Sequence, residues 1–169
     1  MILGLDISTS ITGATVLDGE GNIVYCEAWD TRNKNHFSTL YHKADFVKNK
    51  LKELDNRFDI GYIYIEQSLQ SFRSGFSSAK TLSTLSRFNG IVSWACWQLF
   101  GVEPQMLSAA SARKTVGISI KRGDNAKEKV LNFLLDNEPK FVIMYTKHGN
   151  PKPESYDRAD SIIIARAGY

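Results

Sequence analysis

The spacing of hydrophobic residues along the chain changes twice in its N-terminal part, and this pattern constrains the fold more than any other feature of the sequence. Residues 2–7, 11–17 and 23–29 are short apolar segments separated by polar turns, which predicts three consecutive antiparallel strands. Residues 37–54 then follow the three- and four-residue spacing of an amphipathic helix. Residues 60–65 return to an apolar strand of the kind found buried inside a sheet. The pattern therefore predicts a sheet that combines antiparallel hairpins with a crossover helix.

The rest of the chain alternates helix and strand. We expect a fifth strand over 102–107 and helices over 78–100, over 108–116, from 124 or 125 to about 135, and from about 155 onwards. With 169 residues, of which 43% are hydrophobic, the chain can bury a core and fits one domain. The order of elements predicts a single α/β domain over residues 1–169, with a five-stranded mixed sheet flanked by helices.

Several classes of protein are excluded by composition. Charged and polar residues interrupt every apolar stretch well before the roughly 18 residues that a membrane span needs. The N-terminus lacks the basic and apolar regions of a signal peptide. The only cysteines, Cys26 and Cys96, lie in apolar segments far from any pair of histidines, so neither a disulfide framework nor a zinc site is expected. We expect a cytoplasmic protein without membrane contact.

Four acidic residues occupy positions that suggest metal binding. Asp6 and Glu66 each end an apolar strand, and ligand groups commonly gather at the carboxyl ends of strands. Asp157 and Asp160 are three residues apart and so share one face of the last helix. Each acid could instead cap a turn or pair with a helix dipole. Taken together, they form an all-oxygen ligand set for two Mg²⁺ ions, or Mn²⁺ in their place, which suits hydrolysis of a phosphodiester.

Basic residues concentrate in one stretch, between positions 113 and 129. This stretch carries a local charge of +4 in a chain whose net charge is +3. Clustered charge is often only a solvated face, but it is also what binding to a polyanion requires. The six basic residues are Arg113, Lys114, Lys121, Arg122, Lys127 and Lys129.

Four motifs, each made of one or two segments of the sequence, resemble in their order those of one nuclease family. They are Ile2–Asp6 with Thr12–Val16, Ile63–Gln67, Arg113–Ser119 with Asn125–Val130, and Asp157–Ser161. Each motif is weak alone, but together they span almost the whole chain. The chain thus resembles the RuvC-type Holliday-junction resolvases of the RNase H-like superfamily.

The resemblance implies an RNase H-like fold and a Mg²⁺-dependent endonuclease that cuts four-way DNA junctions. Asp6, Glu66, Asp157 and Asp160 would hold two metal ions, and Lys127 would take the part of the family's lysine near the scissile phosphate. Arg113 or Lys114 would contact phosphate upstream of it. The full set of expected DNA contacts is Arg113, Lys114, Lys121, Arg122, Lys129, Phe72 and Arg73.

A dimer is expected from the substrate. A four-way junction has near two-fold symmetry and needs two cuts, whereas one chain offers one site; a C2 dimer would supply two. The helix over 78–100 is the expected interface, because it is rich in apolar residues, including Trp94 and Trp97. The alternative is that this helix is simply buried in the core of one chain.

The chain departs from the family pattern at two places, which is typical of a divergent member of phage or viral type. Ile7-Ser8-Thr9-Ser10 stands where many members have Pro-Gly, and Leu69 stands near their junction-wedging aromatic, with Phe72 the nearest candidate. Three other functions use similar residues. They are a nuclease acting on RNA or an RNA:DNA hybrid, an inactive nucleic-acid-binding module, and an actin-like ATP-binding kinase fragment, for which the chain lacks a second lobe.

Overall fold

Five strands form one mixed sheet in the computed structural model, which describes residues 1–67 and 79–169. The order across the sheet is β3-β2-β1-β4-β5, and the bounds are Ile2–Asp6 (β1), Ile11–Leu17 (β2), Ile23–Asp30 (β3), Tyr62–Glu66 (β4) and Gln105–Leu107 (β5). The first three strands pair antiparallel, whereas β4 is parallel to β1 and β5 is parallel to β4. The predicted five-stranded mixed sheet is confirmed, with β1 at its centre and β4 inside the sheet as expected.

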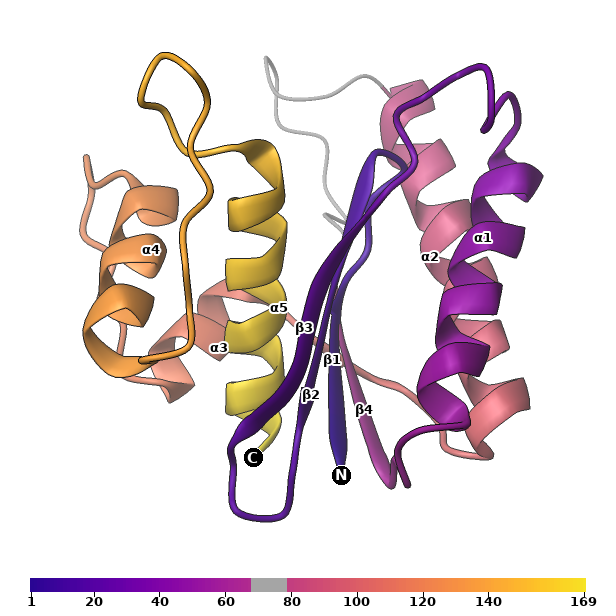
Figure 1. The fold of residues 1–169 in the computed structure, drawn as a ribbon, viewed down its shortest axis with the longest axis horizontal. Helices are drawn as coiled ribbons and strands as arrows, with labels where there is room; N and C mark the ends of the chain where they lie inside the picture. The colour runs from indigo at the N-terminus through magenta and orange to yellow at the C-terminus, as the bar shows by residue number, and fades with distance from the viewer. Residues whose placement is uncertain (68–78) are drawn as a thin grey trace.

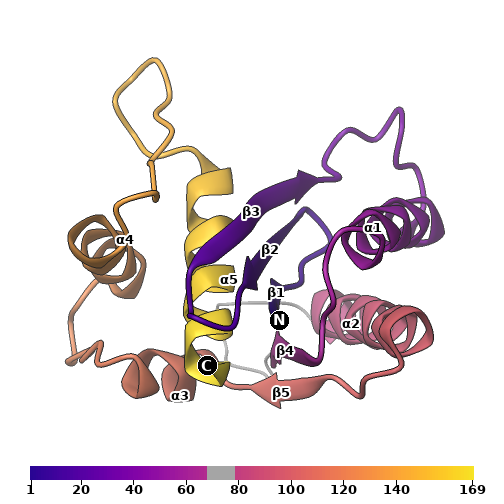
Figure 2. The ribbon, with the colours of Figure 1, turned by 60° about the horizontal axis from the view of Figure 1, so that its bottom comes forward.

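Helices cover both faces of this sheet (Figures 1 and 2). On one face lie α1 (Leu40–Asp55) and α2 (Ala79–Phe100). On the other, α5 (Pro153–Gly168) packs across the strands, with α3 (Ala109–Thr115) and α4 (Ala126–Asn137) against its outer side. The chain reaches β4 from β3 through α1 and reaches β5 from β4 through α2, and both parallel strands therefore need a helix as connection. The predicted α/β architecture is thus confirmed.

The start of α1 differs from the sequence-based prediction. We expected the helix to begin at Phe37, but it begins at Leu40 because Thr39 caps it, its side chain accepting a hydrogen bond from the backbone N–H of His42. Phe37 still packs against α1, with its ring centroid 5.1 Å from that of Phe46. The helix buries one stripe against the sheet, formed by Val47, Leu51 and Leu54.

Two hydrophobic clusters lie on opposite faces of the sheet. Leu3 and Leu5 of β1 point towards α1 and α2, together with Ile63 and Ile65 of β4. Because side chains alternate along a strand, the residues between them face α5 instead. The second cluster joins α5 to α4 and α3 through apolar side chains that include Ile163, Leu134 and Ala112.

Small residues let α5 approach the sheet closely. A Cβ added to Gly4 of β1 would lie 2.5 Å from the backbone nitrogen of Ala165, and one added to Gly13 of β2 would overlap the carbonyl group of Asp157. Between these points the Thr15 and Ser161 hydroxyls form a buried hydrogen bond of 2.8 Å. The helix therefore rests on the main chain of β1 and β2, which fixes its height and rotation above the sheet.

Cys26 and Cys96 are free thiols, as expected. Among the helices formed by residues 1–67 and 79–169, none is long and apolar enough to cross a membrane.

Candidate active site

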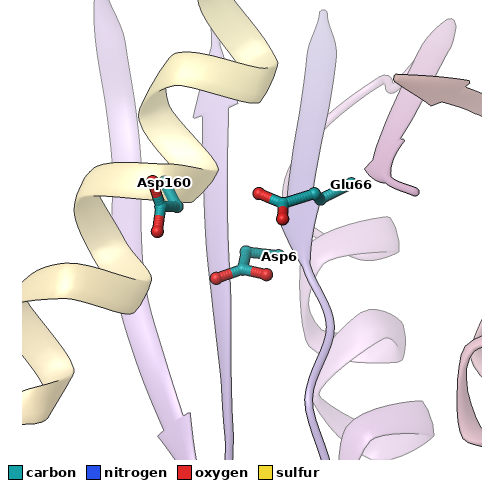
Figure 3. Close-up of side chains that lie close together, drawn as sticks. All are labelled: Asp6, Glu66 and Asp160. Atoms are coloured by element: carbon teal, nitrogen blue, oxygen red, sulfur yellow. The ribbon is translucent and has the colours of Figure 1, made fainter. Parts of the chain in front are cut away.

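Three carboxylates meet at one end of the sheet. Asp6 ends β1 and Glu66 ends β4, and because these neighbouring strands are parallel, their carboxyl ends lie side by side. Asp160 reaches the same point from α5, so the three side chains face one another (Figure 3). One oxygen from each lies within 4.8 Å of the others. This spacing allows all three to bind a common cation.

The close approach of α5 places Asp160 in this cluster. Asp6 pairs directly with Gly13 across the antiparallel strands, and the main chain of Asp157 lies over that glycine. Because Gly13 has no side chain, the first turns of α5 descend to the level of Asp6. Asp160 then projects toward the strand ends one helical turn after Asp157.

Asp157 lies beside the three-carboxylate cluster rather than within it. Its charge raises the pKa of both Asp6 and Glu66. Its own pKa rises to about 6, because burial outweighs the attraction of the Lys127 ammonium group. Its side chain lines an adjoining cavity of about 480 Å³. The structure thus brings three of the four predicted metal ligands into direct proximity and places the fourth next to them.

The cluster favours protonated carboxyls or a bound cation. Burial, followed by repulsion from Glu66 and Asp160, raises the pKa of Asp6 well above its usual value. Burial and the charge of Asp160 raise the pKa of Glu66 to about 7. Burial also raises the pKa of Asp160, although Arg113 opposes the shift. Several neighbouring buried carboxyls whose simultaneous ionisation is unfavourable are typical of a site that binds a divalent ion.

Two basic side chains offset part of this negative charge. An Arg113 guanidinium nitrogen of α3 donates a hydrogen bond to Asp160 over 3.3 Å, and both side chains are mostly buried, at 19% and 15% exposure. Lys127, in the first turn of α4, lowers the pKa of all four carboxyls. Its Nζ lies 5.3 Å from the ring centroid of Tyr156, an arrangement typical of a cation–π contact.

The cavity beside Asp157 is lined by both charged or polar and apolar side chains. Lys127 and Tyr156 line it together with the turn after β1, where Ser8 and Ser10 lie. The Ser8 hydroxyl accepts hydrogen bonds from the backbone N–H groups of Ser10 and Ile11 and donates one to the carbonyl of Ile11. This hydroxyl therefore closes the turn between β1 and β2, in contrast to the phosphate-binding role that an actin-like kinase would require.

The predicted DNA-contacting residues occupy different environments. Lys114 lines a cavity of about 590 Å³ formed by α3 and the loop that follows it. Lys121 and Arg122 are exposed and form no ion pair with the described parts of the chain. Lys129 instead forms an ion pair with Asp124 over 2.6 Å, so the aspartate already neutralises its charge. The remaining predicted contacts, Phe72 and Arg73, lie outside the described residues, as does Leu69.

Sequence reasoning did not identify two residues that support the site. Tyr156 precedes Asp157 and contacts Lys127, but a lone tyrosine at a helix start has no distinctive pattern. Asn89 of α2 is buried, and its amide donates a hydrogen bond to the carbonyl of Glu66 over 3.4 Å. An asparagine on the buried face of an apolar helix was the available signal, since such a group needs a partner.

Comparison with known proteins identifies the fold. No protein-family model and no curated protein sequence matches this chain. Its structure is similar to Thermus thermophilus RuvC in complex with a Holliday junction substrate, with a TM-score of 0.67 and 15% identity over 98% of this chain and 90% of that one. A second structure of Thermus thermophilus RuvC gives a TM-score of 0.63 at 17% identity over 98% and 91% of the two chains. The yeast mitochondrial Holliday junction resolvase Ydc2 gives a TM-score of 0.60 at 15% identity, over 98% of this chain and 76% of that one. The chain therefore has the RNase H-like fold of the RuvC-type resolvases.

Proposed function

We propose that this chain is a divalent-metal-dependent endonuclease that cleaves Holliday junctions or other branched DNA. The observation that carries the proposal is the cluster of Asp6, Glu66 and Asp160, whose oxygens lie within 4.8 Å of one another on a RuvC-like fold. One of the similar structures, Ydc2, is a Holliday junction resolvase by name, and another, Thermus thermophilus RuvC, is in complex with a Holliday junction substrate. These likenesses support the choice of substrate, and the cluster supports the chemistry.

The residues at the site fit hard divalent cations. All the donors are carboxylate oxygens, the ligands that Mg²⁺ and Mn²⁺ prefer. Burial raises the pKa of each of the four carboxyls, and a bound cation would favour their ionised forms. Asp6, Glu66 and Asp160 would hold the metal, with Asp157 completing a second position. When bound, two such ions supply an activated water and stabilise the leaving oxygen of a phosphodiester.

The basic side chains at the site would act on the substrate and on the ligands. Arg113 holds Asp160 through its hydrogen bond, so it orients a carboxylate and is not available as a simple phosphate contact. Lys127 lies beside Asp157 in the open cavity, where its ammonium group can stabilise negative charge that develops on the phosphate. Lys114, Lys121 and Arg122 would bind the DNA backbone outside the site.

We also propose that the enzyme acts as a symmetric dimer through α2. This helix buries Phe88, Val92 and Cys96 against its own chain, yet it leaves Trp94 and Trp97 about half exposed, at 52% and 53%. Exposed tryptophans three residues apart form one apolar stripe. A second copy related by a two-fold axis would cover this stripe and place two sites on a junction of the same symmetry.

Cleavage of a synthetic four-way junction tests the proposed activity. We expect cutting with Mg²⁺ or Mn²⁺, none in EDTA, and weaker cutting of an RNA:DNA hybrid of equal length. Asp6→Asn should abolish cleavage and retain junction binding, because phosphate contacts come from other residues. Preferential cutting of the hybrid would favour the RNA-directed alternative, and an active Asp6→Asn variant would remove Asp6 from the site.

Sedimentation and a plasmid-borne cruciform test the dimer. The wild-type chain should sediment as a dimer at micromolar concentration and cut both strands of the cruciform within one binding event. Trp97→Asp should shift it towards monomer and yield singly nicked plasmid, whereas Tyr41→Asp alters an exposed aromatic residue on α1 and serves as control. A wild-type chain that stays monomeric on the junction and nicks one strand would contradict the paired-cut mechanism.

A further inference from the structure

The segment between α4 and α5 folds into a short hairpin, which we define as residues 144–152. Tyr145 and Pro151 form an antiparallel bridge. Within it, the backbone N–H of Thr146 donates a hydrogen bond to the carbonyl of Asn150 over 2.8 Å. Three of the four prolines of the chain fall between residues 137 and 154, a composition that favours irregular structure. The hairpin is therefore a defined element and not a loose connection.

One buried side chain ties this hairpin to the metal-binding helix. The Ser155 hydroxyl accepts a hydrogen bond from the backbone N–H of Met144 over 3.0 Å and donates one to the carbonyl of Met144 over 3.3 Å. Lys152 closes the base of the hairpin through its N–H to the same carbonyl, at 2.7 Å. Ser155 is fully buried and lies two residues before Asp157. The position of the hairpin is thus coupled to the first turn of α5.

The exposed surface of the hairpin is basic and aromatic. Lys147, His148 and Lys152 are exposed, and Tyr145 is 55% exposed. No acidic residue occurs between Glu138 and Glu154 in the sequence. Neither lysine forms an ion pair with any described part of the chain. The positive charge of this hairpin is therefore available to an external anion.

The hairpin projects from the end of the molecule that carries the carboxylates. In Figure 1 it extends beyond the N-terminal end of α5, at the end of the sheet where β1 and β4 terminate. The β2–β3 turn and the C-terminus of α5 lie at the opposite end. A duplex bound across the carboxylate cluster would pass this hairpin, whereas the opposite end would remain free.

We propose that the 144–152 hairpin is a second DNA-binding element, which binds the sugar–phosphate backbone of the duplex arm that leaves the active site. This inference rests on the proposed nuclease function and extends it. Lys147 and Lys152 would neutralise phosphates without reading sequence, as backbone contacts do. Because Ser155 anchors the hairpin to α5, such contacts would set the position of the DNA relative to Asp157 and Asp160.

Binding measured over a range of salt concentrations tests this proposal. We compare the wild-type chain with Lys147→Gln/Lys152→Gln, using a four-way junction and a plain duplex of one arm in EDTA. Each lost phosphate contact should reduce the slope of log K against log salt by about 0.9, and affinity at about 0.1 M salt should fall roughly tenfold.

The matched control removes the same charge from the other end of the molecule. Lys52 lies in the last turn of α1, Lys140 follows α4 near Asp18 of the β2–β3 turn, and both are exposed. Lys52→Gln/Lys140→Gln should therefore leave the salt slope unchanged. An aryl-azide crosslinker on His148→Cys should also attach to the duplex arm, which reports position independently of affinity.

The possible outcomes separate this proposal from the function it rests on. If the wild-type chain cleaves junctions but the hairpin variant keeps the salt slope of the control variant, the hairpin proposal is wrong and the nuclease function stands. If the wild-type chain neither binds nor cleaves branched DNA, both are wrong. A reduced slope confined to the hairpin variant, together with crosslinking of the hairpin to the duplex arm, supports the proposal.

Discussion

Replacing Glu66 with glutamine should stabilise the metal-free protein while destroying its activity. Burial and the negative charge of Asp160 raise the pKa of Glu66 to about 7 from an ordinary value of 4.5, against the opposing influence of Arg113 and Lys127. Between these two values the folded protein keeps a proton that the unfolded chain has released. Stability therefore falls as the pH rises through this window and levels off above it.

The size of the effect follows from that shift. Ionising a carboxyl whose pKa rises from 4.5 to about 7 costs the folded state about 3 kcal/mol, at 1.36 kcal/mol per pH unit. Glutamine removes this cost but introduces an amide that needs hydrogen-bond partners of its own, which offsets about 1–2 kcal/mol. We expect a net gain of about 1–2 kcal/mol at pH 8, or a Tm higher by about 2–8 °C for a chain of this size.

Thermal unfolding in EDTA at a series of pH values between about 4 and 8 measures this effect. At the acidic end the Tm of Glu66→Gln should lie below that of wild type, because only the cost of the amide remains there, and it should rise above that of wild type to its full difference above pH 7. Glu103→Gln removes a charge from an exposed residue just before β5 and should show no such growth. Adding Mg²⁺ should raise the Tm of the wild type more than that of Glu66→Gln. A variant that is less stable than wild type at pH 8, or equally shifted at all pH values, would refute the reasoning.

Three further predictions concern the residues around the cluster. Lys127→Ala should lower the single-turnover rate more than DNA affinity. Tyr156→Ala should have the same effect to a smaller degree. Tyr156→Phe should retain the rate, because the face of the ring contacts the ammonium group of Lys127. Gly13→Ala should cost about 1–3 kcal/mol and abolish cleavage, as shown by denaturant unfolding beside the junction assay, because the added methyl would overlap the main chain of α5. Lys121→Gln/Arg122→Gln should reduce the salt slope of DNA binding by about one per lost contact, with an unchanged maximal rate.

The secondary structure was largely predictable because local patterns determine it. Short apolar or alternating segments identified the described strands, and apolar residues spaced three or four apart identified the described helices. The predictions differ from the structure at the first residues of some elements. The helix α5 begins at Pro153 and not near Ser155, since proline is well suited to the first position of a helix. Likewise β5 begins at Gln105 instead of residue 102, as its three residues are all that pair with β4.

The site was predictable only where its residues carry a local pattern. Asp6 and Glu66 end apolar strands, so the topology of a parallel pair was enough to bring them together. The roles of Arg113 and Asn89 depend on how α3 and α2 pack against other elements, and no local spacing reveals such contacts. The offset of Asp157 has the same origin, because its position follows from the height of α5 above Gly13.

The features that assemble this site also make it unfavourable without a cation. Gly4 and Gly13 allow α5 to lie on the sheet, and this approach brings Asp160 to the buried ends of β1 and β4. The same burial raises the pKa of the acids, and Arg113 and Lys127 counter only part of the shift. An ion that binds the folded chain alone then stabilises it by mass action. The proposed metal site would link metal affinity to fold stability through the same carboxylates, so a substitution that relaxes α5 away from the sheet should weaken metal binding even where it touches no ligand.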